Sequence, residues 1–156
     1  MQELREPKSI SKVLSGNDTG ETGGHQAGML VPKDQNILSF FPKLGSNEKN
    51  PRALLRIIDD AGHPWQWNFI YYNNKFFGGT RNEYRLTGMT AYFRTNALKP
   101  GDTITLSREE DGHVSIGYLR SENYKNDEKS LSNSREVNGV KRTRIELGST
   151  WKIIKY

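Results

Sequence analysis

The chain of 156 residues contains no cysteine and only three histidines. The absence of cysteine excludes both a disulfide framework and a thiolate metal site. The histidines, His25, His63 and His113, lie far apart in the sequence and form no metal-spaced pair. We therefore expect the protein to bind no metal ion and no cofactor.

Long hydrophobic runs are also missing. No stretch approaches the roughly eighteen apolar residues of a membrane-spanning helix. The first ten residues, MQELREPKSI, lack the apolar segment of a signal peptide. These two absences predict a cytoplasmic protein without a membrane partner.

The formal net charge is +5, and the charges are unevenly distributed along the chain. Residues 72–99 hold five basic side chains and one acid, Glu83, whereas residues 107–128 hold six acids and three bases. One basic segment on a domain of mixed charge is typical of a nucleic-acid-binding protein.

The length predicts a single domain, residues 1–156, with enough chain to bury a core. Many short β-prone stretches separated by turn residues predict a mainly β fold, a barrel or sandwich with one or two short helices.

The first twelve residues are polar and are expected to be frayed. The glycine-rich run 15–28 is expected to be a long exposed loop without helix or strand. Residues 54–58 fit a strand better than a helix, although the Asn-Pro pair before them also suits a helix start. We expect strands at 29–32, 54–58, 65–74, 103–106, 114–119, 142–147 and 150–156, and a short helix or turn at 36–44.

The loop GGTRNEYRLTG, residues 78–88, follows the clearest strand of the chain. Arg81, Glu83 and Arg85 alternate, so on an extended segment their side chains point the same way. Arginine pairs with the O6 and N7 acceptors of guanine, and a carboxylate accepts from the N4 amino group of cytosine. This face therefore suits G·C pairs in a major groove. A surface cluster of ion pairs is the alternative, and the loop alone leaves both interpretations open.

A second glycine-rich loop, LSGNDTGETGGHQAG, precedes the loop of residues 78–88 in the chain. Together with IYYNNKFFGGTRNEYRLTG, it resembles the amino-terminal effector domain of EcoRII-type restriction endonucleases. The resemblance implies a DNA-binding pseudobarrel, an open β-barrel that plant auxin-response transcription factors also use. It implies a bacterial restriction-modification protein whose partners are double-stranded DNA and a covalently linked catalytic nuclease domain outside this chain.

The resemblance also implies that the two loops are arms that enter the major groove from either side. The family member reads the short site CC(A/T)GG. Carried over to this chain, the base-reading residues are His25 and Gln26 in the first arm, and Arg81, Asn82, Glu83 and Arg85 in the second. Contacts with the DNA backbone are expected from Lys33, Lys75, Tyr84, Arg94 and Lys99.

A catalytic site is not expected in this chain. Metal-dependent restriction nucleases need an acid, and then a second acid separated by one residue from a lysine, to hold magnesium and activate water. Residues 6–8 and 127–129 match the second part of this pattern, but both lie in polar stretches without a buried strand.

The favoured interpretation is thus a sequence-specific DNA-binding domain without catalysis of its own. A complete small metal-dependent nuclease is one alternative. The other is a single-strand binder that stacks bases on exposed aromatic rings. We expect Trp67 and Tyr92 in the core, and Trp65 and Phe76 as supports of the arms.

Overall fold

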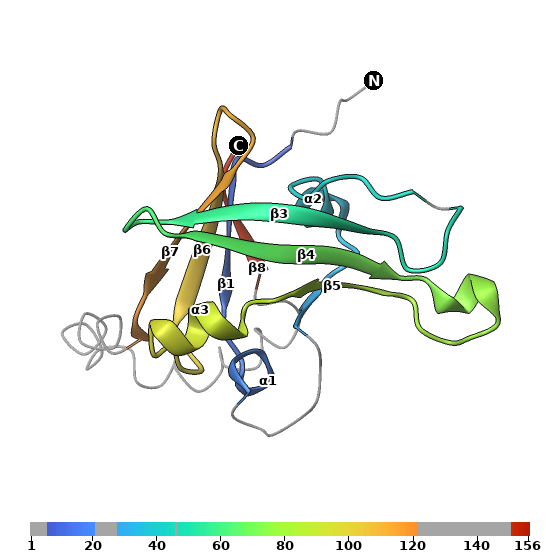
Figure 1. Ribbon diagram of the computed structural model, residues 1–156, viewed down its shortest axis with the longest axis horizontal. Coiled ribbons are helices and arrows are strands. Elements are labelled where there is room, and N and C mark those ends of the chain that lie inside the picture. The colour runs from blue at the N-terminus through green and yellow to red at the C-terminus, as the bar shows by residue number, and fades with distance from the viewer. Residues whose placement is uncertain (1–5, 21–27, 46, 122–150) are drawn as a thin grey trace, which may run out of the picture.

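The computed structural model describes residues 6–20, 28–45, 47–121 and 151–156. In this part of the chain eight strands form one sheet that curls into an open barrel (Figure 1). The strand order is β2-β5-β4-β3-β7-β6-β1-β8, and each neighbouring pair is antiparallel except β3 and β7, which run parallel. The prediction of a mainly β, open-barrel fold is confirmed.

The strands are β1 (Ser9–Val13), β2 (Met29–Val31), β3 (Arg52–Asp59), β4 (Pro64–Tyr72), β5 (Glu83–Thr87), β6 (Thr103–Arg108), β7 (Val114–Leu119) and β8 (Trp151–Lys155). The helices are α1 (Gly16–Thr19), α2 (Gln35–Leu38), α3 (Thr90–Thr95) and the 3-10 helix η1 (Asn74–Phe77).

Alternating apolar residues on the strands fill the inside of the barrel. Trp67 and Phe69 on β4, and Ile104 and Leu106 on β6, belong to the core cluster. Tyr92 on α3 packs edge-on against Trp67, at 5.9 Å between ring centroids. Trp67 and Tyr92 are therefore core residues, as predicted.

The two edge strands of the sheet are joined by a side chain. The indole Nε1 of Trp151 on β8 donates to the backbone oxygen of Leu30 on β2 at 3.0 Å. Trp151 is itself buried in the core cluster. The barrel is thus held together across its opening without a strand ladder between β2 and β8.

The expectation that residues 1–12 are frayed is wrong for Ser9 to Lys12. These residues belong to β1, which pairs with β6 on one side and β8 on the other. Ile10 is fully buried, and the neighbouring polar residues are buried as well because the strand lies between two others. One aliphatic residue among polar ones is too weak a pattern to predict a central strand.

The expectation of a helix-free loop at residues 15–28 is wrong for Gly16–Thr19, which form α1. Ser15 caps this helix: its hydroxyl accepts from the backbone N–H of Asp18, and the Asp18 carboxylate accepts from the backbone N–H of Ser15. This reciprocal capping box starts a helical turn despite the glycines around it. Gly20, with φ +84°, ends it in the left-handed conformation.

The expectation of a loop at residues 78–88 is wrong for Glu83–Thr87, which form β5 and pair with β2 and β4. The other sequence-based elements agree with the structure where it describes them. Residues 54–58 are part of a strand and not of a helix, and the predicted hairpin at 103–119 is present. The expected strand at 142–147 lies outside the described residues. No helix in the described ranges is long and apolar enough to cross a membrane.

Candidate nucleic-acid interface

The ribbon β4–η1–β5 projects from one end of the barrel (Figure 1). We call it the second arm. Its strands pair so that Tyr72 lies opposite Glu83 and Tyr71 lies opposite Tyr84. Because side chains alternate between the faces of a strand, the arm has two different faces. Tyr72, Arg81, Glu83 and Arg85 belong to one of them, which we call the reading face.

Glu83 is the centre of the reading face and joins the two arginines. Its Oε1 accepts from Nε of Arg81 at 3.0 Å and lies 2.9 Å from Nη2 of the same residue. Its Oε2 accepts from Nε and Nη2 of Arg85 at 3.2 and 3.1 Å. Each carboxylate oxygen offers about two acceptor sites. Arg85 uses both sites of Oε2, so at most one site, on Oε1, is left for a ligand.

These contacts control the charge of Glu83. Partial burial opposes ionisation, but the hydrogen bonds and charges of Arg81 and Arg85 outweigh it and hold the pKa of Glu83 below its ordinary value of 4.5. The group is therefore an anion at neutral pH, placed between two cations. A carboxylate in this state is an acceptor only.

Arg81 is held in place without being buried. Its guanidinium lies 3.8 Å from the centroid of the Tyr72 ring, and its side chain is 42% exposed. Stacking on one side and the Glu83 bond along one edge fix the plane of the group. The exposed guanidinium is a planar donor, which is the shape needed for a bidentate contact with guanine.

Arg85 is in a different situation, because its side chain is only 12% exposed. Besides the two bonds to Glu83, its Nη1 donates to the backbone oxygen of Gly28 at 3.2 Å. Gly28 ends the first loop and leads into β2. Arg85 thus connects the second arm to the root of the first, and less of it is available to DNA than of Arg81.

The structure brings Arg81, Glu83 and Arg85 together but separates Asn82 from them. Asn82 lies on the opposite face, where its Oδ1 accepts from the hydroxyl of Tyr71 at 2.6 Å. Its predicted role as a base reader stays a prediction, which this orientation does not favour.

Tyr84, predicted to contact the DNA backbone, also lies on this opposite face. Its ring stacks between Tyr71, at 4.3 Å, and Phe69, at 5.6 Å, and Phe69 in turn stacks on Phe41 at 4.5 Å. These four nearly parallel rings form what we call the aromatic column. Burial, and then the neighbouring Tyr71, raise the pKa of Tyr84 above its ordinary value, so the phenol is neutral.

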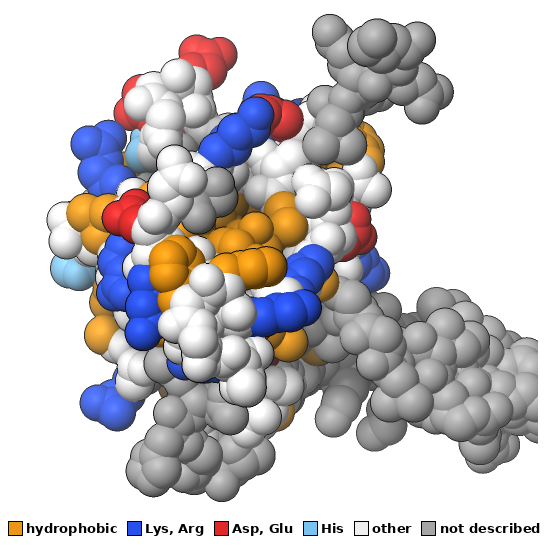
Figure 2. Space-filling view, turned by 90° about the vertical axis from the view of Figure 1, so that its right-hand side faces the viewer, with side chains coloured by type: hydrophobic (Ala, Val, Ile, Leu, Met, Phe, Trp, Pro, Cys, Tyr) orange, Lys and Arg blue, Asp and Glu red, His pale blue; other side chains and the backbone are white. Residues whose placement is uncertain are grey.

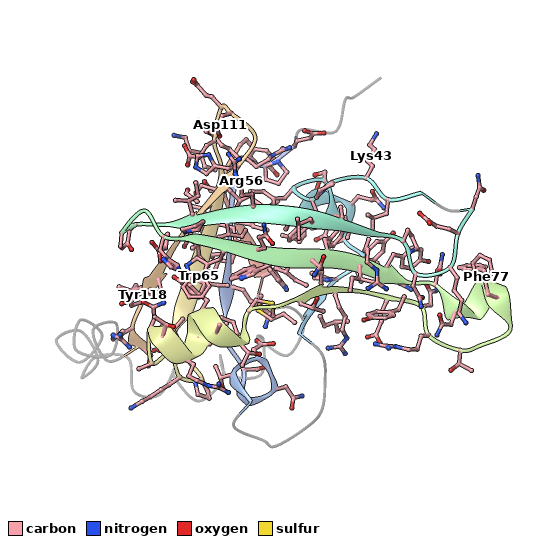
Figure 3. The ribbon with its side chains drawn as sticks, viewed as in Figure 1. Lys43, Arg56, Trp65, Phe77, Asp111 and Tyr118 are labelled. Atoms are coloured by element: carbon pink, nitrogen blue, oxygen red, sulfur yellow. The ribbon has the colours of Figure 1, made fainter. Side chains whose placement is uncertain are left out.

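The tip of the second arm is tied together by backbone hydrogen bonds. The N–H of Lys75 donates to the oxygen of Arg81 at 2.9 Å, and the N–H of Gly79 donates to the oxygen of Asn74 at 2.7 Å. At Gly79 a Cβ would lie 2.8 Å from the Cβ of Asn74, so this close turn requires glycine. Phe76 and Phe77 are exposed on the tip, where Figure 3 shows Phe77.

The base of the second arm is anchored by Asn73. This residue is buried, its Oδ1 accepts from the N–H of Asn50 at 2.7 Å, and its Nδ2 donates to the oxygen of Glu48 at 2.9 Å. Both halves of the amide are thus used, and the loop before β3 is fixed to the arm.

The first arm is described at its two ends only. His25 and Gln26 lie outside the described residues, so their predicted contacts stay predictions. At the incoming end, Lys12 on β1 forms a largely buried ion pair with Asp18 of α1. At the outgoing end, a Cβ on Gly28, which has φ +78°, would lie 2.0 Å from the oxygen of Leu86 on β5. Only glycine permits this approach.

The cations predicted to contact phosphates all lie on the surface, but only some are near the arms. Lys75 is on the tip of the second arm, and Arg94 lines a cleft of about 250 Å³ between α1 and α3, beside Gly20 and Gly28. Lys33 and Lys99 are exposed on connecting loops. Figure 2, which looks onto the end of the molecule carrying the second arm, shows Lys and Arg side chains on both sides of a hydrophobic centre.

The remaining candidates do not join this site. Glu6, from the possible nuclease triplet, pairs with Arg108 at 3.1 Å, and the triplet 127–129 lies outside the described residues. Within the described ranges, no group of three or more His, Asp or Glu side chains is placed to hold a metal ion. Trp65 does not support the tip of the second arm, because it lies at the other end of β4, where Figure 3 labels it. There its ring packs on Tyr92 and its Nε1 donates to Asp59. The register of the hairpin determines which residues Trp65 meets at that end, and this register cannot be predicted from composition.

Comparison with known proteins identifies the family. Residues 6–108 match the family model described as restriction endonuclease EcoRII, N-terminal. The chain belongs to the EcoRII amino-terminal domain family. Both arms lie within the matched residues, and the resemblance drawn from their two motifs is confirmed.

Relatives of this EcoRII-type domain are found in bacteria and plants. The type II restriction enzyme EcoRII of Escherichia coli is 37% identical over 98 residues, which is 61% of this chain and 24% of the enzyme. The B3 domain-containing transcription repressor VAL2 of Arabidopsis thaliana is 32% identical over 115 residues, 73% of this chain and 13% of the repressor. The chain therefore spans about a quarter or less of the length of these relatives.

A solved structure shares the fold of this EcoRII-type domain. A chain of the Arabidopsis FUS3–DNA complex superposes with a TM-score of 0.55 and 20% identity, covering 71% of this chain and 95% of that one. At this identity the match establishes the fold. The open barrel is thus the pseudobarrel that the two loop motifs imply.

Tyr71 and Tyr72 are the residues of the site that sequence reasoning missed. They end β4, the first strand of the second arm, and adjacent residues of a strand point to opposite faces. The two adjacent tyrosines therefore indicated that one of them shares the face of the arginines and that the other lies on the opposite face. Which tyrosine lies on which side depends on the register with β5, which the structure supplies.

Proposed function

We propose that this chain is a sequence-specific double-stranded DNA-recognition domain, the effector part of an EcoRII-type restriction endonuclease. Two arms enter the major groove and read a short site such as CC(A/T)GG. His25 and Gln26 of the first arm, and the reading face of the second, make the base contacts. The family assignment and the pseudobarrel fold support this function.

The observation that carries the proposal is the position of Glu83. It is the one acid in a basic segment, it is held ionised, and it lies between two arginines on an accessible face. A surface that bound only phosphates would gain nothing from this carboxylate, since it repels the DNA backbone. A carboxylate that accepts from cytosine N4 beside an arginine that donates to guanine reads adjacent G·C pairs.

Catalysis is assigned to a separate domain. The proposal includes a covalently linked nuclease domain beyond this chain, which the greater length of the restriction enzyme EcoRII supports. It also includes a bacterial cytoplasmic location. Incubation of the chain with magnesium and plasmid DNA that carries the preferred site should leave the plasmid intact. Cleavage would instead support the small-nuclease alternative.

Binding selection from a random duplex pool at a stated salt concentration tests the main proposal. The selected site should bind roughly a thousandfold more tightly than random duplex in a mobility-shift titration. Arg81→Ala should remove most of this preference. Arg56→Ala is the matched control, because Arg56 is also exposed and pairs with an acid, Asp111. Equal affinity of the unmodified chain for selected and random duplexes would reject sequence-specific recognition, and preference for single strands would favour the second alternative.

A further inference from the structure

We propose that the hydrogen bond between Tyr71 and Asn82 positions the reading face, and that these two residues set base selectivity from the side of the second arm that faces away from DNA. The inference rests on the proposed function. It assigns Asn82 the role of a positioning residue, which holds its neighbours Arg81 and Glu83, instead of a contact with a base.

The register of the arm places Tyr71 and Asn82 together. Tyr71 lies opposite Tyr84, so Asn82, two residues before Tyr84, is the diagonal neighbour of Tyr71 on the same face. The hydroxyl of Tyr71 donates to Oδ1 of Asn82 at 2.6 Å in a partly buried setting. The contact is short and partly shielded from solvent, as expected of a bond that fixes a conformation.

This bond occurs where the ladder between the strands stops. The pairing of β4 with β5 ends at Tyr72 and Glu83, and residues 80–82 have no assigned strand structure. Arg81 lies in this stretch, yet its guanidinium must be placed precisely to contact a base. Beyond the ladder, the backbone bond from the N–H of Lys75 to the oxygen of Arg81 crosses the arm at 2.9 Å. The side chain of Asn82 adds a second cross-strand hydrogen bond beside it.

Tyr71 is the outermost ring of the aromatic column, and the other three rings hold it in place. Its ring is stacked on Tyr84 with an interplanar angle of 8°, Tyr84 is stacked on Phe69 at 14°, and Phe69 on Phe41 at 11°. Phe41 and Phe69 are buried in the core. The phenol oxygen of Tyr71 is therefore located with respect to the barrel, and Asn82 is located with respect to the phenol.

The two residues on either side of Asn82 are both part of the reading face. A change in the backbone angles of Asn82 shifts Arg81 relative to Glu83, because the three residues are consecutive and Glu83 is held by its pairing with Tyr72. Such a shift disturbs the bond between Arg81 and Glu83 and so affects both residues. A functional constellation must be held within about 0.5 Å of its productive geometry. Loss of the bond should therefore affect the base pairs read by both neighbours, and leave contacts made elsewhere unchanged.

The test is a double-mutant cycle of Tyr71→Phe and Asn82→Ala, in which each variant is titrated against the selected duplex, all its single-base-pair variants and random duplex. Each single change should lower the preference for the selected duplex by about three- to tenfold, spread over the two neighbouring base pairs. Affinity for random duplex and the salt slope should not change. The double variant should be no worse than either single one, because both remove the same bond.

Two further variants separate positioning from base reading. Asn82→Asp keeps the acceptor for Tyr71 and should retain the preference, although it weakens all duplexes alike by repulsion. Tyr118→Phe removes the hydroxyl of an exposed tyrosine on β7 and serves as the control, with no effect expected. Thermal melting of each variant, compared with that of the unmodified chain, checks that the fold is intact.

Three results would overturn the inference. One is a loss confined to a single base pair with Asn82→Ala and Asn82→Asp but absent with Tyr71→Phe, which would make Asn82 a base reader. Another is additivity of the two single variants. The third is an unchanged preference in Tyr71→Phe. If the unmodified chain shows no preference at all, the proposed function itself fails, and that outcome is seen before any variant is made.

Discussion

The two faces of the second arm are built from alternate residues of the same strands, yet they have opposite chemistry. The reading face consists of an anion between two cations, with the outer cation stacked on Tyr72. The other face is the aromatic column, which continues into the core. The comparison shows how a thin two-stranded ribbon presents charges at a defined position: the apolar face anchors it to the barrel, and the polar face is left for a ligand.

The largest difference between the faces is expected in stability. Phe69→Ala removes a buried ring that stacks on both Phe41 and Tyr84, and should lower the free energy of unfolding by about 3–5 kcal/mol. Arg81→Ala, on the reading face, should change it by less than about 0.5 kcal/mol. Urea denaturation of both variants measures this. Similar losses would mean that the charged face also holds the arm in place.

Base selectivity should depend on the reading face. Glu83→Ala is expected to cost about 1–3 kcal/mol of binding free energy on the selected duplex and to relax selectivity at one base pair. Affinity for random duplex should rise slightly, because a charge that repels phosphates has gone. Glu110→Ala, an exposed acid in the β6–β7 turn, is the control.

Competition titration with single-base-pair variants provides the measurement for Glu83. A mutant that binds every duplex a little better and discriminates as before would show that Glu83 is a solvated surface acid. A loss spread over several positions would show that it only braces the arginines.

A smaller and uniform effect is expected from cations outside both faces. Arg94→Ala should weaken binding to all duplexes alike and reduce the slope of log affinity against log salt by about one unit. Lys43→Ala is a suitable comparison, because Figure 3 shows Lys43 pointing away from the arms. A change in sequence preference with an unaltered slope would contradict a backbone contact by Arg94.

The smallest expected effect is a pH dependence of stability that originates in Glu83. Its pKa is lowered in the folded protein, so its ion pairs stabilise the fold above the unfolded pKa, and this contribution is lost as the pH falls through the folded pKa. Glu83→Gln should therefore lose stability relative to the unmodified chain at about pH 7, with the difference narrowing towards about pH 3. Parallel denaturation curves at several pH values test this, and a constant difference would contradict it.

Much of this arrangement follows from the sequence, and the exceptions have physical causes. The alternation of Arg81, Glu83 and Arg85 correctly predicts that they share a face, because the period of a strand is a local property. The two motifs identify the family. The same alternation places Asn82 and Tyr84 on the opposite face, although their expected roles came from the family resemblance. The local pattern does not specify which residues of β4 they meet there, because that depends on the register of the two strands.

The beginning of the chain shows the same limit. β1 is a central strand only because β6 and β8, both far away in the sequence, supply its partners. The helix α1 is different, since the Ser15–Asp18 spacing is a local capping signal that the surrounding glycines obscured.

The pairing of β2 with β5 has a consequence for the length of the DNA site. β2 carries the returning end of the first arm and β5 carries the reading face of the second, so one hydrogen-bonded strand pair joins the roots of both arms. The approach of Gly28 to Leu86 leaves no space between these strands. Each inserted base pair moves the two halves of a duplex apart by about 3.4 Å. Under the proposed function, the strand pair fixes the distance between the two arms. We therefore expect a site with one extra central base pair to bind weakly, even when every base in both halves is correct.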